Sequence, residues 1–206
     1  MARVSQEHLD ARRRQILTGA ARCFAGNGFH GTSMQDVLKE VGLSAGAVYR
    51  YFTGKEELIA AIAAEAFGRI GGAFEQAADL TPPPAPDVLL GRVLRGALDG
   101  GMYGLERRAC AMLVVQVWAE TMRNEHLATA LGEGYAAMRA AWVRLVEAYR
   151  EAGAMTSDVP ADDVARTMIA AAQGFLAQEA LFGGVGPEVL ENGLRGLMSM
   201  DPQKIS

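Results

Sequence analysis

The sequence has few of the residue types that build disulfide frameworks or metal sites. Its 206 residues include two cysteines and three histidines. Cys23 and Cys110 lie far apart, each inside an apolar helical pattern, so we expect both to be small core residues. The histidines are scattered, and none has the spacing of a ligand pair; they are His8, His30 and His126. We therefore predict neither a metal site nor a disulfide.

Long hydrophobic runs are also missing. The longest runs, such as Ala109 to Val115, end far short of the about 20 apolar residues that a membrane span needs. The N-terminal segment contains basic residues with no apolar stretch behind them, so no secretory signal is predicted. We expect a cytoplasmic protein with no membrane partner.

Strand patterns are nearly absent. No segment alternates apolar and polar residues over a strand length, whereas apolar spacings of three and four recur throughout. The sequence therefore predicts an all-α protein of about nine helices. Prolines between Leu80 and Pro86 mark the clearest break, because proline removes an amide and clashes with the preceding turn. The expected helices cover residues 8–25, 33–40, 45–51, 54–79, 87–99, 103–122, 125–152, 161–182 and 187–200.

The chain has no net positive charge, and its formal charge of −4 by itself argues against a nucleic-acid partner. The charges are unevenly distributed, however. Residues 1–58 hold eight Lys/Arg and six Asp/Glu, whereas residues 59–206 hold twelve and eighteen. Four of the cations form a basic N-terminal arm: Arg3, Arg12, Arg13 and Arg14. Such a run is usually a solvated face, but a basic arm on an acidic body suits contact with phosphates at one end.

Three helix starts follow one another closely after the first helix. Thr32 and Gln35 have the spacing of a capping box, and Thr53 and Glu56 repeat it. Between these pairs, Ser44 is a good N-cap. The sequence therefore predicts two short helices followed by a long one.

The turn between the two short helices runs from Glu40 to Leu43, and Gly42 provides the sharp reversal. This is the spacing of a helix-turn-helix. A set of apolar side chains would close a small core against the first helix: Met34, Val37, Leu38, Val41, Leu43, Val48 and Phe52.

That core leaves one face of the second short helix free. Small residues at its start would let the backbone approach base edges, while Tyr49 and Arg50 could reach into a major groove. Tyr49 and Tyr51 could instead be core residues, and Arg50 could reach either a base or a phosphate. Lys55 lies at the next helix start, where amides and a cation converge on a phosphate. The predicted DNA-binding residues are Thr32, Ser33, Ser44, Ala45, Gly46, Tyr49, Arg50, Tyr51 and Lys55.

The run from Gly28 to Leu58 resembles the DNA-binding domain of the TetR family. That family repeats Gly-x-x-x-(Thr/Ser), a Ser-led recognition helix ending in Tyr-x-x-Phe, and Lys-Glu-x-Leu. The matching residues are Gly28, Thr32-Ser33, Ser44-x-Gly46-x-Val48-Tyr49-x-Tyr51-Phe52 and Lys55-Glu56-x-Leu58. Tyr51 departs from the pattern, because the family often has His there. The resemblance implies a three-helix DNA-binding domain in residues 1–53, a ligand-sensing and dimerisation domain in 54–206, and repression that a small molecule relieves.

Catalysis has almost no support in the sequence. A Gly-x-Gly-x-x-Gly pattern spans residues 26–31, but a predicted helix precedes it and no strand is in sight. We interpret it as a helix end and a turn rather than a dinucleotide site. No nucleophile-elbow sequence brings Ser, His and acidic residues together. We predict that the protein is not an enzyme and has no cofactor.

The body is rich in aromatic residues and methionines, which usually form a core but also suit an adaptable apolar pocket. Few charged residues interrupt them, so we expect a mainly apolar or aromatic ligand. The candidate pocket residues are Phe67, Phe74, Met102, Tyr103, Met112, Trp118, Met122, Met138, Trp142 and Phe175.

The last two expected helices carry apolar stripes that would either pack on their own chain or form a four-helix dimer interface. The candidate interface residues are Met168, Ala172, Phe175, Leu190, Leu194 and Leu197. Composition and spacing by themselves predict a helix-turn-helix on a helical body. The resemblance to the TetR family further implies a homodimeric transcriptional repressor that binds a pseudo-palindromic operator and is released by an unidentified small molecule. The main alternative is a small helical enzyme or ligand carrier. An activator, or a DNA-binding protein without any ligand, also stays open.

Overall fold

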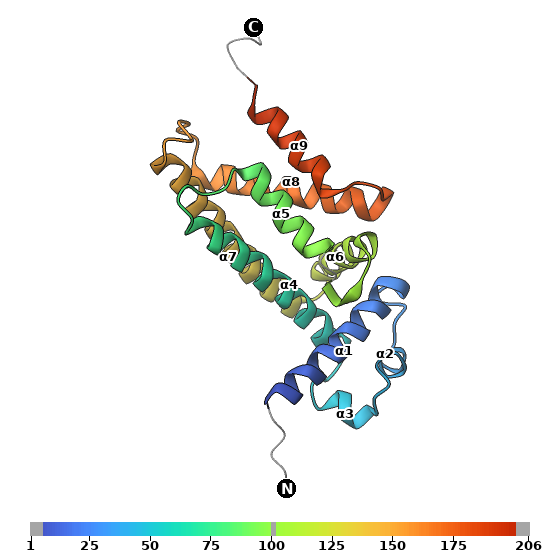
Figure 1. Cartoon of the computed structure of the whole chain (residues 1–206). Coiled ribbons are helices and arrows are strands. Elements are labelled where there is room, and N and C mark those ends of the chain that lie inside the picture. Colours follow the sequence, from blue (N-terminus) through green and yellow to red (C-terminus); the bar gives the residue numbers. More distant parts are fainter. Residues whose placement is uncertain (1–5, 100–101, 201–206) are drawn as a thin grey trace.

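The computed structural model describes residues 6–99 and 102–200, and all regular secondary structure within these ranges is helical (Figure 1). The predicted all-α class is therefore confirmed. The helices are α1 (Gln6–Asn27), α2 (Met34–Val41), α3 (Ala45–Tyr49), α4 (Lys55–Ala78), α5 (Pro86–Leu98), the 3₁₀ turn η1 (Met102–Gly104), α6 (Arg107–Thr121), α7 (Glu125–Glu151), α8 (Ala161–Phe182) and α9 (Pro187–Met198). The helix expected over 103–122 is wrong at its start, because Tyr103 inside η1 has a φ of 60° and α6 begins only at Arg107.

The first helix buries the apolar face that its sequence predicts. Ile16, Leu17 and Phe24 are fully buried, together with Ala20 and Ala21. The helix ends where Gly28 takes a φ of 79°, in the left-handed region that favours glycine. The glycine-rich pattern over 26–31 is therefore a helix end followed by a turn, as interpreted above.

Both predicted capping boxes are wrong by about one residue. The N-cap of α2 is Ser33, whose hydroxyl accepts from the Asp36 amide at 3.2 Å, while the Asp36 carboxylate accepts from the Ser33 amide at 2.8 Å. Thr32 cannot serve because its hydroxyl is buried and donates to the Gly28 carbonyl at 2.7 Å.

At the start of α4 the N-cap is Gly54, which makes no side-chain capping bond. The amide and the hydroxyl of Thr53 instead donate to the Glu57 carboxylate, at 2.6 and 2.9 Å. The acceptor therefore lies one residue later than Glu56, the predicted partner.

The helix-turn-helix itself follows its local signals. Gly42 caps α2 in the left-handed conformation, with φ 66° and ψ 31°, and provides the predicted reversal. The hydroxyl of Ser44 accepts from the Ala47 amide at 3.4 Å and starts α3. Helix α3 ends at Tyr49, two residues earlier than expected.

Helix α4 connects the N-terminal helices to the body. In Figure 1 helices α1–α3 gather at one end of α4, at the bottom of the view, whereas α8 and α9 lie at the top. Helix α4 packs along α7, α5 packs on α9, and α8 packs against α6 and α7. The apolar core around helices α1–α3 extends past the domain boundary predicted at residue 53. It includes Leu58 and Ile62 of α4 as well as Leu113 and Val117 of α6. The division at 53/54 stays a prediction.

Two absences concern the described ranges only. No helix there is long and apolar enough to cross a bilayer. No three His, Cys, Asp or Glu side chains there gather closely enough to hold a metal ion. Cys23 and Cys110 are both buried, as the apolar patterns around them predict.

The packing of α1 on α2 depends on Gly19. A Cβ at this position would lie 2.3 Å from Cγ1 of Val41, whereas a Cβ at Gly26 of the same helix would meet nothing within 4 Å. We expect Gly19→Ala to lower the unfolding free energy, because overpacking costs about 1–3 kcal/mol and helix propensity returns only about 1 kcal/mol. Gly26→Ala is the matched control, and we expect it to be neutral or stabilising. Thermal unfolding checks both, at roughly 2–4 °C per kcal/mol. Equal melting temperatures for the two variants would contradict this close approach.

Candidate nucleic-acid interface and internal cavity

The two short helices present a free face that begins at Ser44. Val48 and Phe52 are buried against α1 and α4, and their spacing of four residues fixes the inner side of this segment. Tyr49 is therefore turned outward, with 46% of its surface exposed, and Arg50 is exposed beside it. This arrangement leaves a phenol and a guanidinium free to meet a ligand outside the domain.

The start of α3 is open and has small side chains. Ser44, Ala45 and Gly46 are exposed, and a Cβ at Gly46 would meet nothing within 4 Å. Ser33 is exposed at the start of α2. Tyr51 is only half-buried, and the Arg50 guanidinium lies 5.6 Å from the centre of its ring. A rigid backbone with small side chains at this point permits close approach to a nucleic-acid groove.

Two of the predicted DNA-binding side chains, those of Thr32 and Lys55, form hydrogen bonds with other residues of the chain. Thr32 is 1% exposed, so its hydroxyl serves the end of α1 rather than a phosphate. Lys55 donates from Nζ to the Phe29 carbonyl at 3.0 Å and lies 4.7 Å from the centre of the Phe29 ring. Both interactions involve the loop after α1, which contains Thr32 and accepts the Lys55 hydrogen bond at Phe29.

That loop joins the N-terminal helices to α6. The Phe29 amide donates to Oε1 of Gln116 at 3.0 Å, and Nε2 of His30 lies 3.0 Å from Oε2 of Glu120. Glu120 is buried, which makes this pair a specific contact of the junction. No local sequence pattern predicts this junction, because 87 residues separate Phe29 from Gln116.

A second junction involves the predicted basic arm. Nη1 of Arg13 lies 2.6 Å from Oε1 of Glu65, and the Tyr103 hydroxyl donates to Oε2 of the same carboxylate at 2.6 Å. Burial, and then this hydrogen bond, raise the pKa of the Tyr103 hydroxyl above its usual value. Arg13 is therefore turned toward the body rather than toward phosphates. Arg3 lies outside the described residues.

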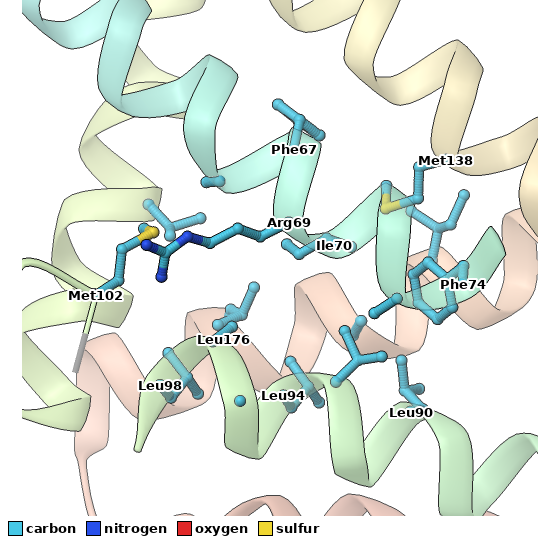
Figure 2. Close-up of a pocket in the computed structure, with 18 of the residues that line it drawn as sticks. Phe67, Arg69, Ile70, Phe74, Leu90, Leu94, Leu98, Met102, Met138 and Leu176 are labelled. Atoms are coloured by element: carbon cyan, nitrogen blue, oxygen red, sulfur yellow. The ribbon is translucent and has the colours of Figure 1, made fainter. Parts of the chain in front are cut away.

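The body encloses a cavity of about 560 Å³. Residues from α4, α5, η1, α6, α7 and α8 line it, and nearly all of these side chains are apolar (Figure 2). Both tryptophans of the chain, Trp118 and Trp142, belong to the lining. A cavity of this size falls within the range of small-molecule sites.

Six of the ten candidate pocket residues line the cavity: Phe67, Phe74, Met102, Trp118, Met138 and Trp142. The other four do not. Met112 and Met122 are exposed on the outer side of α6 and at its end, and Phe175 packs in the core of the body. Tyr103 is drawn away by its bond to Glu65.

The polar part of the lining escaped the sequence analysis. It includes Arg69, Arg92 and Tyr135, which are ordinary surface residue types in amphipathic helices and carry no motif. Cys110 also lines the cavity, and burial raises the pKa of its thiol to about 11, so the sulfur is protonated at neutral pH.

Helices α8 and α9 carry a group of exposed apolar side chains. The most exposed are Phe182, at 77%, and Leu197, at 67%, and Leu181, Val189 and Met198 accompany them. Of the predicted interface residues, only Leu197 belongs to this group. Met168 and Phe175 are buried in their own chain and are unavailable to a partner. Leu190 and Leu194 pack partly on the same core, and Ala172 lines the cavity.

Two family models match separate parts of the chain. The family model described as "Bacterial regulatory proteins, tetR family" matches residues 16–62. The model described as "BetI-type transcriptional repressor, C-terminal" matches residues 92–196. The first covers the helix-turn-helix, and the second covers most of the body.

Individual relatives agree. The chain is 45% identical over 65 residues to the HTH-type transcriptional repressor Rv1474c of Mycobacterium tuberculosis, a match that covers 32% of this chain and 35% of that protein. The chain thus spans about a third of the length of the first curated relatives that it matches. It is 27% identical over 165 residues to the HTH-type transcriptional regulator UidR of Escherichia coli K12, which covers 80% of each.

Solved structures extend the likeness to the whole chain. Salmonella enterica GusR superposes with a TM-score of 0.74 at 29% identity, covering 97% of this chain and 100% of that one. Reduced Escherichia coli NemR superposes with a TM-score of 0.69 at 20% identity, covering 90% and 95%, and this likeness concerns the fold alone.

Proposed function

The chain belongs to the TetR family of bacterial regulatory proteins, which are transcriptional regulators and not enzymes, and from this premise we propose that it is a homodimeric, DNA-binding repressor. A small, mainly apolar molecule in the cavity of the body releases it from its operator. The observation that carries the proposal is the outward face of α3, with Tyr49 and Arg50 exposed beside an open helix start.

Helix α3 enters the major groove. The exposed positions Ser44 to Gly46 allow the backbone to approach, Tyr49 and Arg50 contact bases or phosphates, and Ser33 contacts a phosphate from the start of α2. In a dimer the two recognition helices lie about 34–36 Å apart, one helical turn of DNA, which makes the operator pseudo-palindromic. Lys55 can contact a phosphate only if its hydrogen bond to the Phe29 carbonyl breaks when DNA binds.

The dimer forms through α8 and α9. Exposure of the apolar side chains of Phe182 and Leu197 to water costs free energy. Helices α8 and α9 of two copies of the chain would cover these side chains in a four-helix interface. The proposed dimer interface thus uses the two helices that the sequence predicts, but it involves their exposed side chains instead of the buried ones.

Ligand binding reaches DNA through two helices that serve both regions. Helix α6 contributes Leu113 and Trp118 to the cavity, and it holds the loop after α1 through Gln116 and Glu120. Helix α4 lines the cavity over much of its length and begins next to α3. A shift of either helix changes the spacing of the two recognition helices, and a coupling of a few kcal/mol is enough to release DNA.

The first prediction concerns α3. We expect Tyr49→Ala and Arg50→Ala each to weaken binding to operator DNA by about tenfold or more, because a lost contact of this kind costs about 1–3 kcal/mol. Fluorescence anisotropy at fixed salt, on fragments selected from genomic DNA, measures the affinity. Arg123→Gln is the control, since Arg123 is exposed in the body. Unchanged affinity in both α3 variants, with normal helicity, would remove α3 from the interface.

The second prediction concerns the dimer. We expect Phe182→Glu and Leu197→Glu to yield monomers, because each places a charge in the apolar contact. The matched control is Met122→Glu, which changes a methionine that is 82% exposed at the end of α6. Sedimentation equilibrium distinguishes the states. Dimers in all three variants would place the interface elsewhere.

A further inference from the structure

The cavity lining has an unusual balance of charge. Among the described residues that line the cavity, two carry a formal charge, Arg69 of α4 and Arg92 of α5, and none is an Asp or Glu. This is opposite to the surrounding chain, since residues 59–206 carry twelve Lys/Arg against eighteen Asp/Glu. The cavity thus has positive charge on an otherwise acidic body.

Both arginines are exposed, and the described residues give neither of them a carboxylate partner. Neither makes an ion pair or a hydrogen bond with any residue in the described part of the chain. For Arg69 the expected partner is Glu65, one turn earlier on α4, which is a favourable arrangement for a helix pair. Both oxygens of Glu65 are already engaged, however, by Arg13 and by Tyr103. The exposed guanidinium of Arg69 thus has no carboxylate partner among the described residues.

Arg69 is placed where it can meet a bound molecule. Figure 2 shows its side chain extending from α4 toward Met102, above Leu98 of α5. Arg69 is exposed, whereas Phe74, Leu90 and Trp142 on the cavity wall are buried. The site thus has a charged, open end and an apolar depth.

We propose that the cavity takes an organic anion, a molecule with an apolar body and one carboxylate that pairs with Arg69. The guanidinium offers two parallel donors that match a carboxylate. Arg92 adds positive potential, and the Tyr135 hydroxyl, which has no hydrogen bond in the described residues, offers a further donor. A cation would meet two like charges and no acid. This inference rests on the proposed ligand-responsive function and names the class of ligand.

The size of the cavity limits the ligand. Since a water molecule occupies roughly 30 Å³ in the liquid, a cavity of about 560 Å³ accommodates about fifteen to twenty non-hydrogen atoms. A medium-chain fatty acid, or an aromatic carboxylate of similar size, meets this limit. Dodecanoate is therefore a suitable probe.

The test uses the intrinsic fluorescence of the full-length protein, because both of its tryptophans line the cavity. Dodecanoate, dodecanol and dodecyltrimethylammonium are titrated below their micellar concentrations at pH 8. The three share one apolar chain and differ in charge. We expect dodecanoate to bind at least about tenfold more tightly than dodecanol, in line with a charged hydrogen bond, and the ammonium to bind most weakly.

Variants locate the charge contact. We expect Arg69→Gln to remove most of the preference for dodecanoate over dodecanol while leaving the affinity for dodecanol unchanged, and Arg92→Gln to reduce the preference less. Arg69→Lys keeps the charge but loses the paired donors, so it should retain part of the preference. Arg123→Gln removes the same charge from an exposed position outside the cavity lining and should change nothing.

Three outcomes overturn the inference: no binding of dodecanoate, equal or tighter binding of dodecanol or the ammonium, or a preference that survives both Arg69→Gln and Arg92→Gln.

The repressor proposal is tested separately, by operator binding in the absence of any ligand. A protein that binds its operator but shows no anion preference loses only the ligand class. A protein that prefers dodecanoate but binds no operator loses the repressor function and keeps the anion site.

Discussion

The short loop between α1 and α2 is held by α1, α4 and α6, and this constraint joins the N-terminal helices to the body. The amide of Phe29 donates to Gln116 on α6, its carbonyl accepts from Lys55 on α4, and its ring packs on Phe24 with 5.3 Å between the ring centres. Because one residue contacts three helices, the position of the helix-turn-helix follows the positions of α4 and α6. The loop thus sets the orientation of α2 and α3 relative to the body.

The same two helices line the cavity. Leu113 and Val117 of α6 belong both to the core of the N-terminal helices and to the cavity wall, so no separate layer lies between the two regions. Glu65 of α4 adds a polar connection, since it joins Arg13 of α1 to Tyr103 of η1. Under the proposed mechanism, a ligand that displaces a cavity wall would move residues of the N-terminal core directly. The unpaired Arg69, one turn after Glu65, places the proposed ligand charge beside this connection.

Local features were predictable from the sequence, and long-range contacts were not. The reversal at Gly42, the N-cap at Ser44 and the outward side of α3 follow from backbone preferences and from the spacing of Val48 and Phe52. The N-cap of α2 was misplaced because the fate of the Thr32 hydroxyl depends on the end of α1. Phe67 and Met112 are both apolar residues inside helices, and packing decides that Phe67 lines the cavity while Met112 faces outward. The junction at Gln116 has no local signal at all.

The central claim, that the cavity wall controls the position of the DNA-binding helices, can be tested without any ligand. Val114 of α6 lines the cavity, and Val114→Phe fills part of it from that helix. Met112→Phe places the same ring on the exposed side of α6 and serves as the control. Operator affinity of both variants, measured on dimers of normal helicity, decides the matter. The account predicts at least about fivefold weaker binding for Val114→Phe alone, the lower end of typical allosteric coupling. Equal affinity of the two variants and the unmodified protein would contradict it.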